Sequence, residues 1–394
     1  MPGPGKRQEL YEPFDPDYLR GLIGSGFGEL LDRYFRARII GAEKIPDKGP
    51  ILMAPNHSGT AFPYDAMVLD GLLWRRDGYR PEKKFRSVFE KQLSLTWWMR
   101  PFGIDNFWRR CGGVDLTFEN LHLLLERGER VVYYPEGVPG IGKGFDNRYQ
   151  LQRYSTSFII HCARNNAPVV PISVVNAEWV IPFCYTFRPI DWLVQKLGVP
   201  FLPLPGALIA ITFPWAWYMA LPARMVFVVG DPIDVAAMCR EEGLTKLDKS
   251  EREGLKRVAE KVRLQSQVAL NKAVESHGRW PYQWRSLRKE LWAARKRLFK
   301  LLPLGWPAEF IRYERDTRFP PARRGFRRLL RDWDLIGFYL PLGWPLLSLF
   351  RALRKPPFGY RGLSREERKN REGAYYWHLA RNPLPPREDA SQKS

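Results

Sequence analysis

The chain has 394 residues, which suffices for one large domain or two ordinary ones, and 45% of them are apolar, as in typical globular proteins. Its formal net charge of +21 predicts an anionic partner, namely nucleic acid, an acidic membrane surface, or a phosphorylated or CoA-type substrate. Four scattered cysteines without a CxxC pair argue against a disulfide scaffold or a zinc site and favour a reducing compartment.

Residues 1–36 are predicted to form an N-terminal segment with short amphipathic helices. The helical pattern occupies residues 17–36 (DYLRGLIGSGFGELLDRYFR), and glycines break it into one or two pieces. The stretch before it, MPGPGKRQELYEPFDP, has no apolar core, so we expect no secretory signal there.

Residues 37–280 alternate between two patterns. Short apolar runs bounded by Gly, Pro or Asn are typical of strands, and helical patterns lie at 117–127, 155–165 and 250–276. This alternation predicts an α/β domain that the last helix closes. The strand-like runs are ARIIG, PILMAPN, FRSVFE, RVVYYPEG, APVVPISVVNA and RMVFVVGDPI. The expected inner stripes are Phe118, Leu121, Leu124 and Leu125 in the first helix and Leu255, Val258, Val262, Gln265, Ala269 and Ala273 in the last.

The longest apolar run is GALIAITFPWAWYMAL, residues 206–221. It is short for a membrane span of about 20 residues, and Pro214 interrupts it. We therefore interpret it as interfacial or buried, and we expect a protein that touches a membrane without crossing it.

Residues 281–386 are predicted to form a basic, mainly helical region for membrane association, followed by a disordered tail at 387–394. Between 281 and 371 there are roughly two dozen Lys and Arg against about eight acidic residues. The hexapeptide LPLGWP occurs at 302–307 and 340–345, each time after a basic amphipathic stretch, which indicates a duplicated helix–turn unit. The apolar faces of the two stretches contain Trp284, Leu287, Leu291, Leu298 and Leu302, and Phe326, Leu329, Leu330, Trp333 and Ile336.

This basic region has two interpretations. In the first, its Trp- and Leu-rich faces lie on an anionic bilayer and bring the active site to its lipid. In the second, the apolar stripes pack on the α/β domain and the charges are solvated. We favour membrane binding, because two short basic amphipathic units that end in the same hexapeptide suit a surface anchor.

Asn56 and His57 stand where an apolar strand gives way to a loop. The carboxyl ends of strands in open α/β sheets face the ligand crevice, and an imidazole there can take a proton from a hydroxyl. Such a base needs a carboxylate to fix its tautomer, and Asp65 is the candidate because Pro63 suits a first helical position. The other interpretation is a turn in which Asp65 caps the helix and His57 makes a local hydrogen bond.

Two further stretches indicate anion binding. In YYPEGVPGIGKGFDNRYQLQR, a strand ends at Pro135-Glu136-Gly137, and a Gly-rich loop follows with Lys143 and then Arg148. No GK[ST] is present, so this is not a Walker loop, and Lys143 by itself is more consistent with a solvated surface charge. In WRRCGGVDLTFEN, Arg109 and Arg110 precede two glycines and a helix expected to start at Asp115 or Thr117.

Together these blocks, with VVPIS at residues 169–173, resemble the glycerophospholipid acyltransferase superfamily in kind and order over residues 37–235. This superfamily includes lysophosphatidate acyltransferases and related diacylglycerol and wax-ester acyltransferase-like proteins. The resemblance implies an α/β fold with a central mixed sheet flanked by helices. It implies His57 as general base and Asp65 as its orienting carboxylate. The implied substrate-binding residues are Asn56, Arg109, Arg110, Glu136, Gly137, Lys143, Arg148 and Pro171.

Two departures from the family pattern bear on the substrate. Seven residues separate His57 from Asp65, where the family has four, although a loop containing Gly59 could return the carboxylate to the imidazole. The family continues Thr-Arg-Ser after Glu-Gly, and its arginine holds the acceptor's phosphate, whereas here Val138-Pro139-Gly140 follows. Either Lys143 or Arg148 substitutes for that arginine, or the acceptor is a neutral lipid such as diacylglycerol, a long-chain alcohol or a glycolipid.

The sequence therefore predicts a peripheral O-acyltransferase on the cytoplasmic side of the membrane. It would transfer a fatty acyl group from acyl-CoA or acyl carrier protein to a lipid hydroxyl, with no metal and no other cofactor. The alternative is a catalytically inactive lipid-binding protein of the same fold. We expect no nucleic-acid partner, because no zinc-finger, RNP or helix-turn-helix pattern is present. A serine hydrolase is disfavoured by the lack of a GxSxG elbow, and His122, His161, His277 and His378 are interpreted as isolated structural or surface residues.

Overall fold

The computed structural model describes residues 14–58, 62–89, 107–182, 212–213 and 218–318, and parts of 326–349. The tail expected to be disordered (387–394) and most of the apolar run 206–221 lie outside the described residues.

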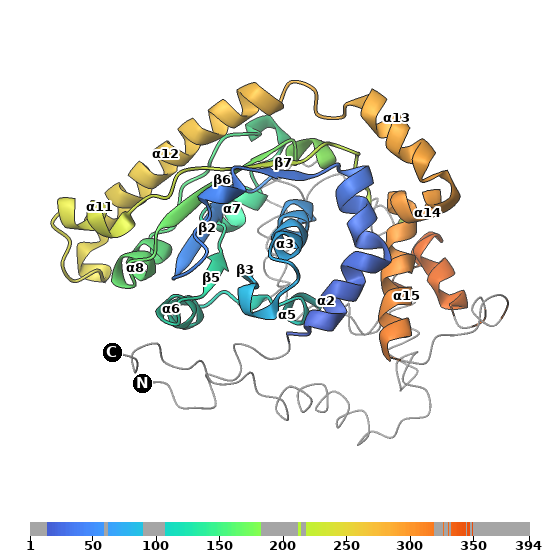
Figure 1. The fold of residues 1–394 in the computed structure, drawn as a ribbon, viewed down its shortest axis with the longest axis horizontal. Coiled ribbons are helices and arrows are strands. Elements are labelled where there is room, and N and C mark those ends of the chain that lie inside the picture. The colour runs from blue at the N-terminus through green and yellow to red at the C-terminus, as the bar shows by residue number, and fades with distance from the viewer. Residues whose placement is uncertain are drawn as a thin grey trace, which may run out of the picture.

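A seven-stranded sheet forms the centre of the described chain (Figure 1). The pair β6–β7 is antiparallel and the other neighbouring pairs are parallel, so the expected mixed sheet is confirmed. The two-residue strand β4 was not among the predicted runs. In spatial order the strands are β1 (Arg38–Ile40), β7 (Val226–Val229), β6 (Val169–Val175), β2 (Ile51–Pro55), β5 (Arg130–Val132), β3 (Arg86–Phe89) and β4 (Val114–Asp115).

The middle strands are covered on both faces, which explains their continuous apolar sequences. Every residue of β2 and β6 is buried. Leu52 and Ala54 belong to the core on one face of β2, and Ile51 and Met53 to the core on the other. Each fully buried large side chain of this kind contributes roughly 1.5–3 kcal/mol. These strands therefore place their carboxyl ends at a rigid edge of the sheet.

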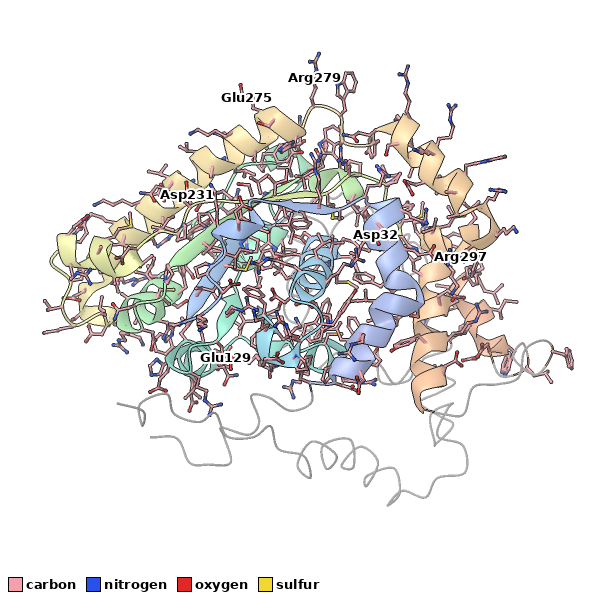
Figure 2. The ribbon with its side chains drawn as sticks, viewed as in Figure 1. Asp32, Glu129, Asp231, Glu275, Arg279 and Arg297 are labelled. Carbon is pink, nitrogen blue, oxygen red and sulfur yellow. The ribbon has the colours of Figure 1, made fainter. Side chains whose placement is uncertain are left out.

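The first face packs against α6 (Phe118–Glu126), α8 (Ser157–Arg164), α11 (Val235–Glu241) and α12 (Arg252–His277). The predicted helices at 117–127, 155–165 and 250–276 are thus confirmed within a few residues. Thr117 caps α6 by accepting a hydrogen bond from the Asn120 amide, so the alternative start at Asp115 is wrong. Charged side chains such as Glu275 and Arg279 project outward near the end of α12 (Figure 2).

The predicted inner stripe of α12 is correct at Leu255, Val258, Val262 and Ala273. It is wrong at Gln265 and Ala269, because the helix buries Ser266 and Leu270 instead. After Val258 the buried positions continue in steps of four to Leu270 and then by three to Ala273, so a three-residue step at Val262 places only Gln265 and Ala269 one position too early. In α6, Phe118 is also mostly exposed, in contrast to the buried Leu121, Leu124 and Leu125.

The second face packs against α3 (Tyr64–Arg76) and the N-terminal segment. In that segment α2 (Pro16–Leu22) is capped by Asp15 and continues through two π-helical turns, Ile23–Phe27 and Leu30–Tyr34. Gly26, within the first of these turns, has non-helical dihedral angles, so the predicted break at a glycine is confirmed. The short helices α5 (Phe107–Arg110) and α7 (Gly137–Ile141) complete the domain.

Three C-terminal helices, α13 (Trp284–Ala293), α14 (Leu298–Leu301) and α15 (Trp306–Arg318), lie beside α2 and the N-terminal turns (Figure 1). Arg33 pairs with Glu290 at 2.9 Å, and the Tyr313 hydroxyl donates to the Tyr18 carbonyl at 2.8 Å. Among the described residues, no helix is both long and apolar enough to cross a membrane.

The two LPLGWP hexapeptides share a turn. The amide of Gly305 donates to the Leu302 carbonyl at 2.8 Å, and that of Gly343 donates to the Leu340 carbonyl at 3.0 Å. A Cβ at Gly305 would lie 2.1 Å from the Phe299 carbonyl oxygen, and one at Gly343 would lie 1.8 Å from the Gly337 carbonyl oxygen. Only glycine fits either position, which supports the duplicated unit. The first hexapeptide opens α15 at its Trp rather than only closing the helix before it.

Candidate active site

Asn56 extends the β2–β6 ladder beyond Pro55. Its side-chain oxygen accepts from the Val174 amide at 2.7 Å, and its side-chain nitrogen donates to the Val174 carbonyl at 3.3 Å. Both ends of the side-chain amide are thus bound to backbone. The described contacts of Asn56 fix the strand end that carries His57, although the sequence suggested a substrate contact.

His57 and Asp65 meet despite their long spacer. Asp65 lies in the first turn of α3, and Pro63 precedes this helix as its cap rather than as its first residue. One oxygen of Asp65, Oδ2, lies 4.0 Å from Nδ1 of His57 and accepts the Ser58 amide at 3.2 Å. The backbone at Ser58 therefore helps to hold the carboxylate beside the imidazole.

Glu136 anchors the other side of His57. It accepts the His57 amide at Oε1 (2.8 Å) and the Gln152 amide at Oε2 (2.7 Å). The Tyr134 ring stacks on the imidazole, with centroids 4.2 Å apart and planes at 19°. A tyrosine two residues before the glutamate is therefore part of the site, and the sequence reasoning did not single it out.

The stretch after Glu136 forms the short helix α7, not the predicted open Gly-rich loop. Gly137 has a φ of +57°, which favours glycine as the chain leaves Glu136. Gly140 packs against the site, because a Cβ there would lie 2.5 Å from Glu136 Cβ and 3.0 Å from His57 Cδ2. The glycines thus allow close packing around His57.

Lys143 is buried, so its interpretation as a solvated surface charge is wrong. Its Nζ lies 3.5 Å from Oε1 of Glu178, and both side chains are completely shielded from solvent. Within the described chain, Nζ has no hydrogen-bond partner. Glu178 opens the 3-10 turn after β6 (Glu178–Val180), and nothing in its local sequence marked it as a partner of Lys143.

The electrostatics of the site follow from burial. Burial, with a smaller effect of the Lys143 charge, lowers the pKa of His57 to about 3, so the imidazole is neutral at physiological pH. Burial raises the pKa of Asp65 and of Glu136, against the opposing effects of Lys143 and of amide hydrogen bonds. Burial also raises the pKa of Glu178, to about 7.

The remaining candidates have other partners. Arg109 pairs with Asp115, and Arg110 lies 3.6 Å from Asp15 and 3.5 Å above the centre of the Tyr18 ring. The guanidinium of Arg148 lies over the Phe145 and Trp179 rings at 4.9 and 5.7 Å. Pro171 is buried in β6 opposite Ala54.

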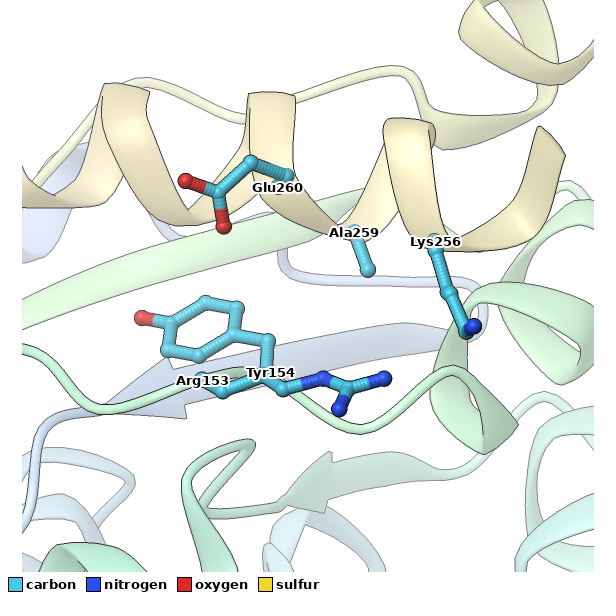
Figure 3. A pocket seen from close by; sticks show the side chains of 5 residues that line it. All are labelled: Arg153, Tyr154, Lys256, Ala259 and Glu260. Atoms are coloured by element: carbon cyan, nitrogen blue, oxygen red, sulfur yellow. The ribbon is translucent and has the colours of Figure 1, made fainter. Parts of the chain in front are cut away.

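A surface hollow of about 340 Å³ lies between α12 and the chain after Arg148 (Figure 3). Its lining contains none of the predicted site residues. Tyr154 also borders a small internal cavity of about 10 Å³ that Asn56 and Pro171 line. The residues lining the hollow are Arg153, Tyr154, Lys256, Ala259 and Glu260.

Two histidines outside the site are not isolated from each other, contrary to the sequence interpretation. The rings of His122 on α6 and His161 on α8 have centroids 5.7 Å apart, and Phe118 lies 4.0 Å from His161. Burial, then the neighbouring His122 and Arg164, lower the pKa of His161 to about 4. This pair belongs to the helix packing, and among the described residues no group of three or more His, Cys, Asp or Glu could hold a metal ion.

Comparison with known proteins gives one family match, over residues 36–175, to the model described as Acyltransferase. Uncharacterized proteins of Mycobacterium bovis and Mycobacterium tuberculosis are 28% identical over 232 residues, or 57% of this chain and 59% of theirs. One from Mycobacterium leprae is 27% identical over 226 residues, or 56% and 57%. The chain thus spans less than two thirds of the length of these relatives.

Among solved structures, the crystal structure of the 1-acyl-sn-glycerophosphate (LPA) acyltransferase from Thermotoga maritima is similar with a TM-score of 0.37 and 14% identity. The match covers 64% of this chain and 79% of that chain.

Proposed function

We propose, from the premise that residues 36–175 form an acyltransferase domain of the glycerophospholipid acyltransferase superfamily, that His57 is the general base of a lipid O-acyltransferase. One observation carries the proposal: a neutral imidazole is fixed at the carboxyl end of β2, with a buried carboxylate 4.0 Å from its Nδ1. A general base needs such a lone pair and an orienting group behind it. Closure around substrates commonly tightens contacts that are long without them.

The chemistry assigns one role to each nitrogen. With Nδ1 toward Asp65, Nε2 accepts the proton of the acceptor hydroxyl as its oxygen attacks the thioester carbonyl. The C–O ester bond forms, the C–S bond breaks, and the proton passes from the imidazolium to the thiolate that leaves. Asp65 stabilises the transient imidazolium, while Glu136 and Tyr134 hold the ring in place.

The thioester supplies its own leaving group, so we propose that acyl-CoA or acyl carrier protein is a co-substrate and that no cofactor is required. The acceptor is a lipid hydroxyl, and specificity between lysophosphatidate and neutral lipids depends on the charges around His57.

We further propose that the C-terminal helices bind the cytoplasmic surface of an anionic membrane. Trp280, Trp284 and Trp292 are 67%, 62% and 71% exposed. They stand among basic side chains, which suits a peripheral lipid contact. The alternative, in which the apolar side chains pack on the α/β domain, fits Leu287 and Leu301, which are buried, but not these exposed tryptophans. The surrounding basic residues are Arg279, Arg285, Arg288, Lys289, Arg295 and Lys296.

Acyl transfer tests the proposal directly. The purified protein and its His57→Ala variant are incubated with labelled acyl-CoA, or acylated carrier protein, and a panel of lysophosphatidate, diacylglycerol, fatty alcohol and glycolipid acceptors. We expect the variant to keep its fold by circular dichroism and to lose about 10²–10⁴-fold in rate. His277→Ala is the matched control, because that side chain is only partly buried at the end of α12.

Retained turnover in His57→Ala would remove His57 as the base. Lipid binding without product from any acceptor, with either donor, would support the alternative of an inactive lipid-binding protein.

A further inference from the structure

Among the described residues, the interior beside His57 contains three acidic side chains and one lysine. Asp65, Glu136 and Glu178 are each no more than 3% exposed. Lys143 is the ammonium whose charge acts on all three carboxylates and on His57. Asp65 lies on α3, Glu136 and Lys143 stand on either side of α7, and Glu178 lies in the turn after β6. The excess of negative charge is therefore a property of the assembled site.

Backbone hydrogen bonds to these carboxylates favour the ionised form and oppose the effect of burial, which raises the pKa of each. Both oxygens of Glu136 accept backbone N–H groups, a pattern that favours the ionised form. Asp65 accepts the amide of Ser58, and hydrogen bonds from Ser58 and Ala66 oppose the effect of burial on its pKa. Glu178 accepts the Tyr149 amide at 3.3 Å, and among the described residues Lys143 is the ammonium that offsets the negative charge of the three carboxylates.

The other basic candidates are engaged elsewhere in the described chain. Arg109 binds Asp115, and Arg110 lies between Asp15 and the Tyr18 ring. Arg148 stacks over aromatic rings at the surface. The positions after Glu136-Gly137 hold Val138 and Pro139, which offer no charge to an anion.

We infer that the acceptor is a lipid with an uncharged hydroxyl-bearing headgroup, of the monoacylglycerol or diacylglycerol type, and that the site discriminates against a phosphate monoester. The inference rests on the proposed acyltransferase function. A phosphate brings nearly two negative charges close to three buried carboxylates that share the Lys143 ammonium, in a region of low dielectric where like charges repel strongly. A neutral glycerol hydroxyl makes the same approach to His57 without that repulsion.

A matched pair of acceptors tests the inference. Monoacylglycerol and lysophosphatidate with the same acyl chain differ only by the phosphate, and each is presented at equal mole fraction in neutral detergent micelles with the same acyl thioester. We expect kcat/KM to be about tenfold or more higher for monoacylglycerol. Lysophosphatidate makes its micelle anionic, and the net charge of +21 attracts the protein to it, so this attraction works against the expected result.

Glu178→Gln provides the second measurement. This substitution is nearly isosteric, removes one acidic group and leaves Lys143 without its ion-pair partner, so the site becomes more positive. We expect the preference for monoacylglycerol over lysophosphatidate to fall about threefold or more, because lysophosphatidate gains relative to its neutral counterpart.

The outcomes separate the two proposals. A wild-type preference for lysophosphatidate, or an acceptor ratio that does not change in a folded Glu178→Gln variant, overturns the neutral-acceptor inference and leaves acyl transfer intact. Absence of product from both acceptors and from the wider panel overturns the acyltransferase proposal, and the inference with it.

Discussion

The interior around His57 and the surface of the C-terminal helices carry opposite charges. In the described part of the chain around His57, three buried carboxylates face one buried ammonium, and each carboxylate accepts a backbone amide. On α13, basic side chains project into solvent beside exposed tryptophans. Under the proposals above, the positive surface determines where the protein binds, and the acidic interior determines which headgroup reaches the base.

Replacement of the buried Lys143 has the largest expected effect, because it removes the positive charge from the acidic interior. In Lys143→Met, Glu178 loses its partner inside the protein, and we expect the free energy of unfolding to fall by about 3 kcal/mol. Urea denaturation measures the change. The double variant Lys143→Met/Glu178→Gln restores about half or more of the loss. If the single and double variants lose the same free energy of unfolding, Lys143 and Glu178 are not energetically coupled.

The close packing at Gly140 is the next most sensitive feature of the interior. In Gly140→Ala the new methyl group meets Glu136 Cβ and the edge of the His57 ring, so the two must move apart. We expect about 1–3 kcal/mol of destabilisation and a larger proportional loss of acyl transfer than of stability. Gly24→Ala is the control, since nothing lies within 4 Å of a Cβ at that position. Similar activity in both variants would show that Gly140 does not set the geometry of the base.

Parts of the interior also differ in how far the sequence predicts them. Continuous apolar runs identified β2 and β6, because burial on both faces demands apolar residues at every position. The approach of Asp65 to His57 was expected from the resemblance to the acyltransferase blocks, because the residues alone left the turn interpretation open. Lys143 and Glu178 are 35 positions apart, however, and their pairing depends on where α7 and the turn after β6 settle.

The same limit explains the error in α12. A helical stripe is read by accumulating steps of three or four, so one wrong step moves Gln265 and Ala269 into positions that Ser266 and Leu270 occupy. Two-residue strands such as β4 have no periodicity to read. The error in α12 also concerns the site, because Ser266 and Leu270 line the small internal cavity together with Asn56 and Pro171.

Acid is expected to lower the stability of the α/β domain through the buried His161. The pKa of His161 is lowered to about 4 from an ordinary value near 6.5, so the unfolded chain binds the extra proton between these values. Its contribution to stability, about 3 kcal/mol, is therefore complete above pH 6.5 and is lost as pH falls toward 4. Denaturation from pH 7 to pH 4 measures the slope, which we expect to be shallower in His161→Leu. A slope that is unchanged in this variant would assign the acid sensitivity to other groups.

The smallest effect on folding, and the clearest test of the outer region, comes from Trp292, which is 71% exposed on α13. Trp292→Ala should change the free energy of unfolding by no more than about 0.5 kcal/mol, because the ring has little packing to lose. Affinity for anionic phosphatidylserine vesicles should nevertheless fall several-fold, since interfacial aromatic rings and basic neighbours act together. Leu264→Ala on α12 is the matched control, being half exposed on the α/β domain. If both variants bind vesicles like the wild type, the exposed face of α13 does not contact the lipid, and the contrast between an acidic interior and a membrane-binding surface loses its outer half.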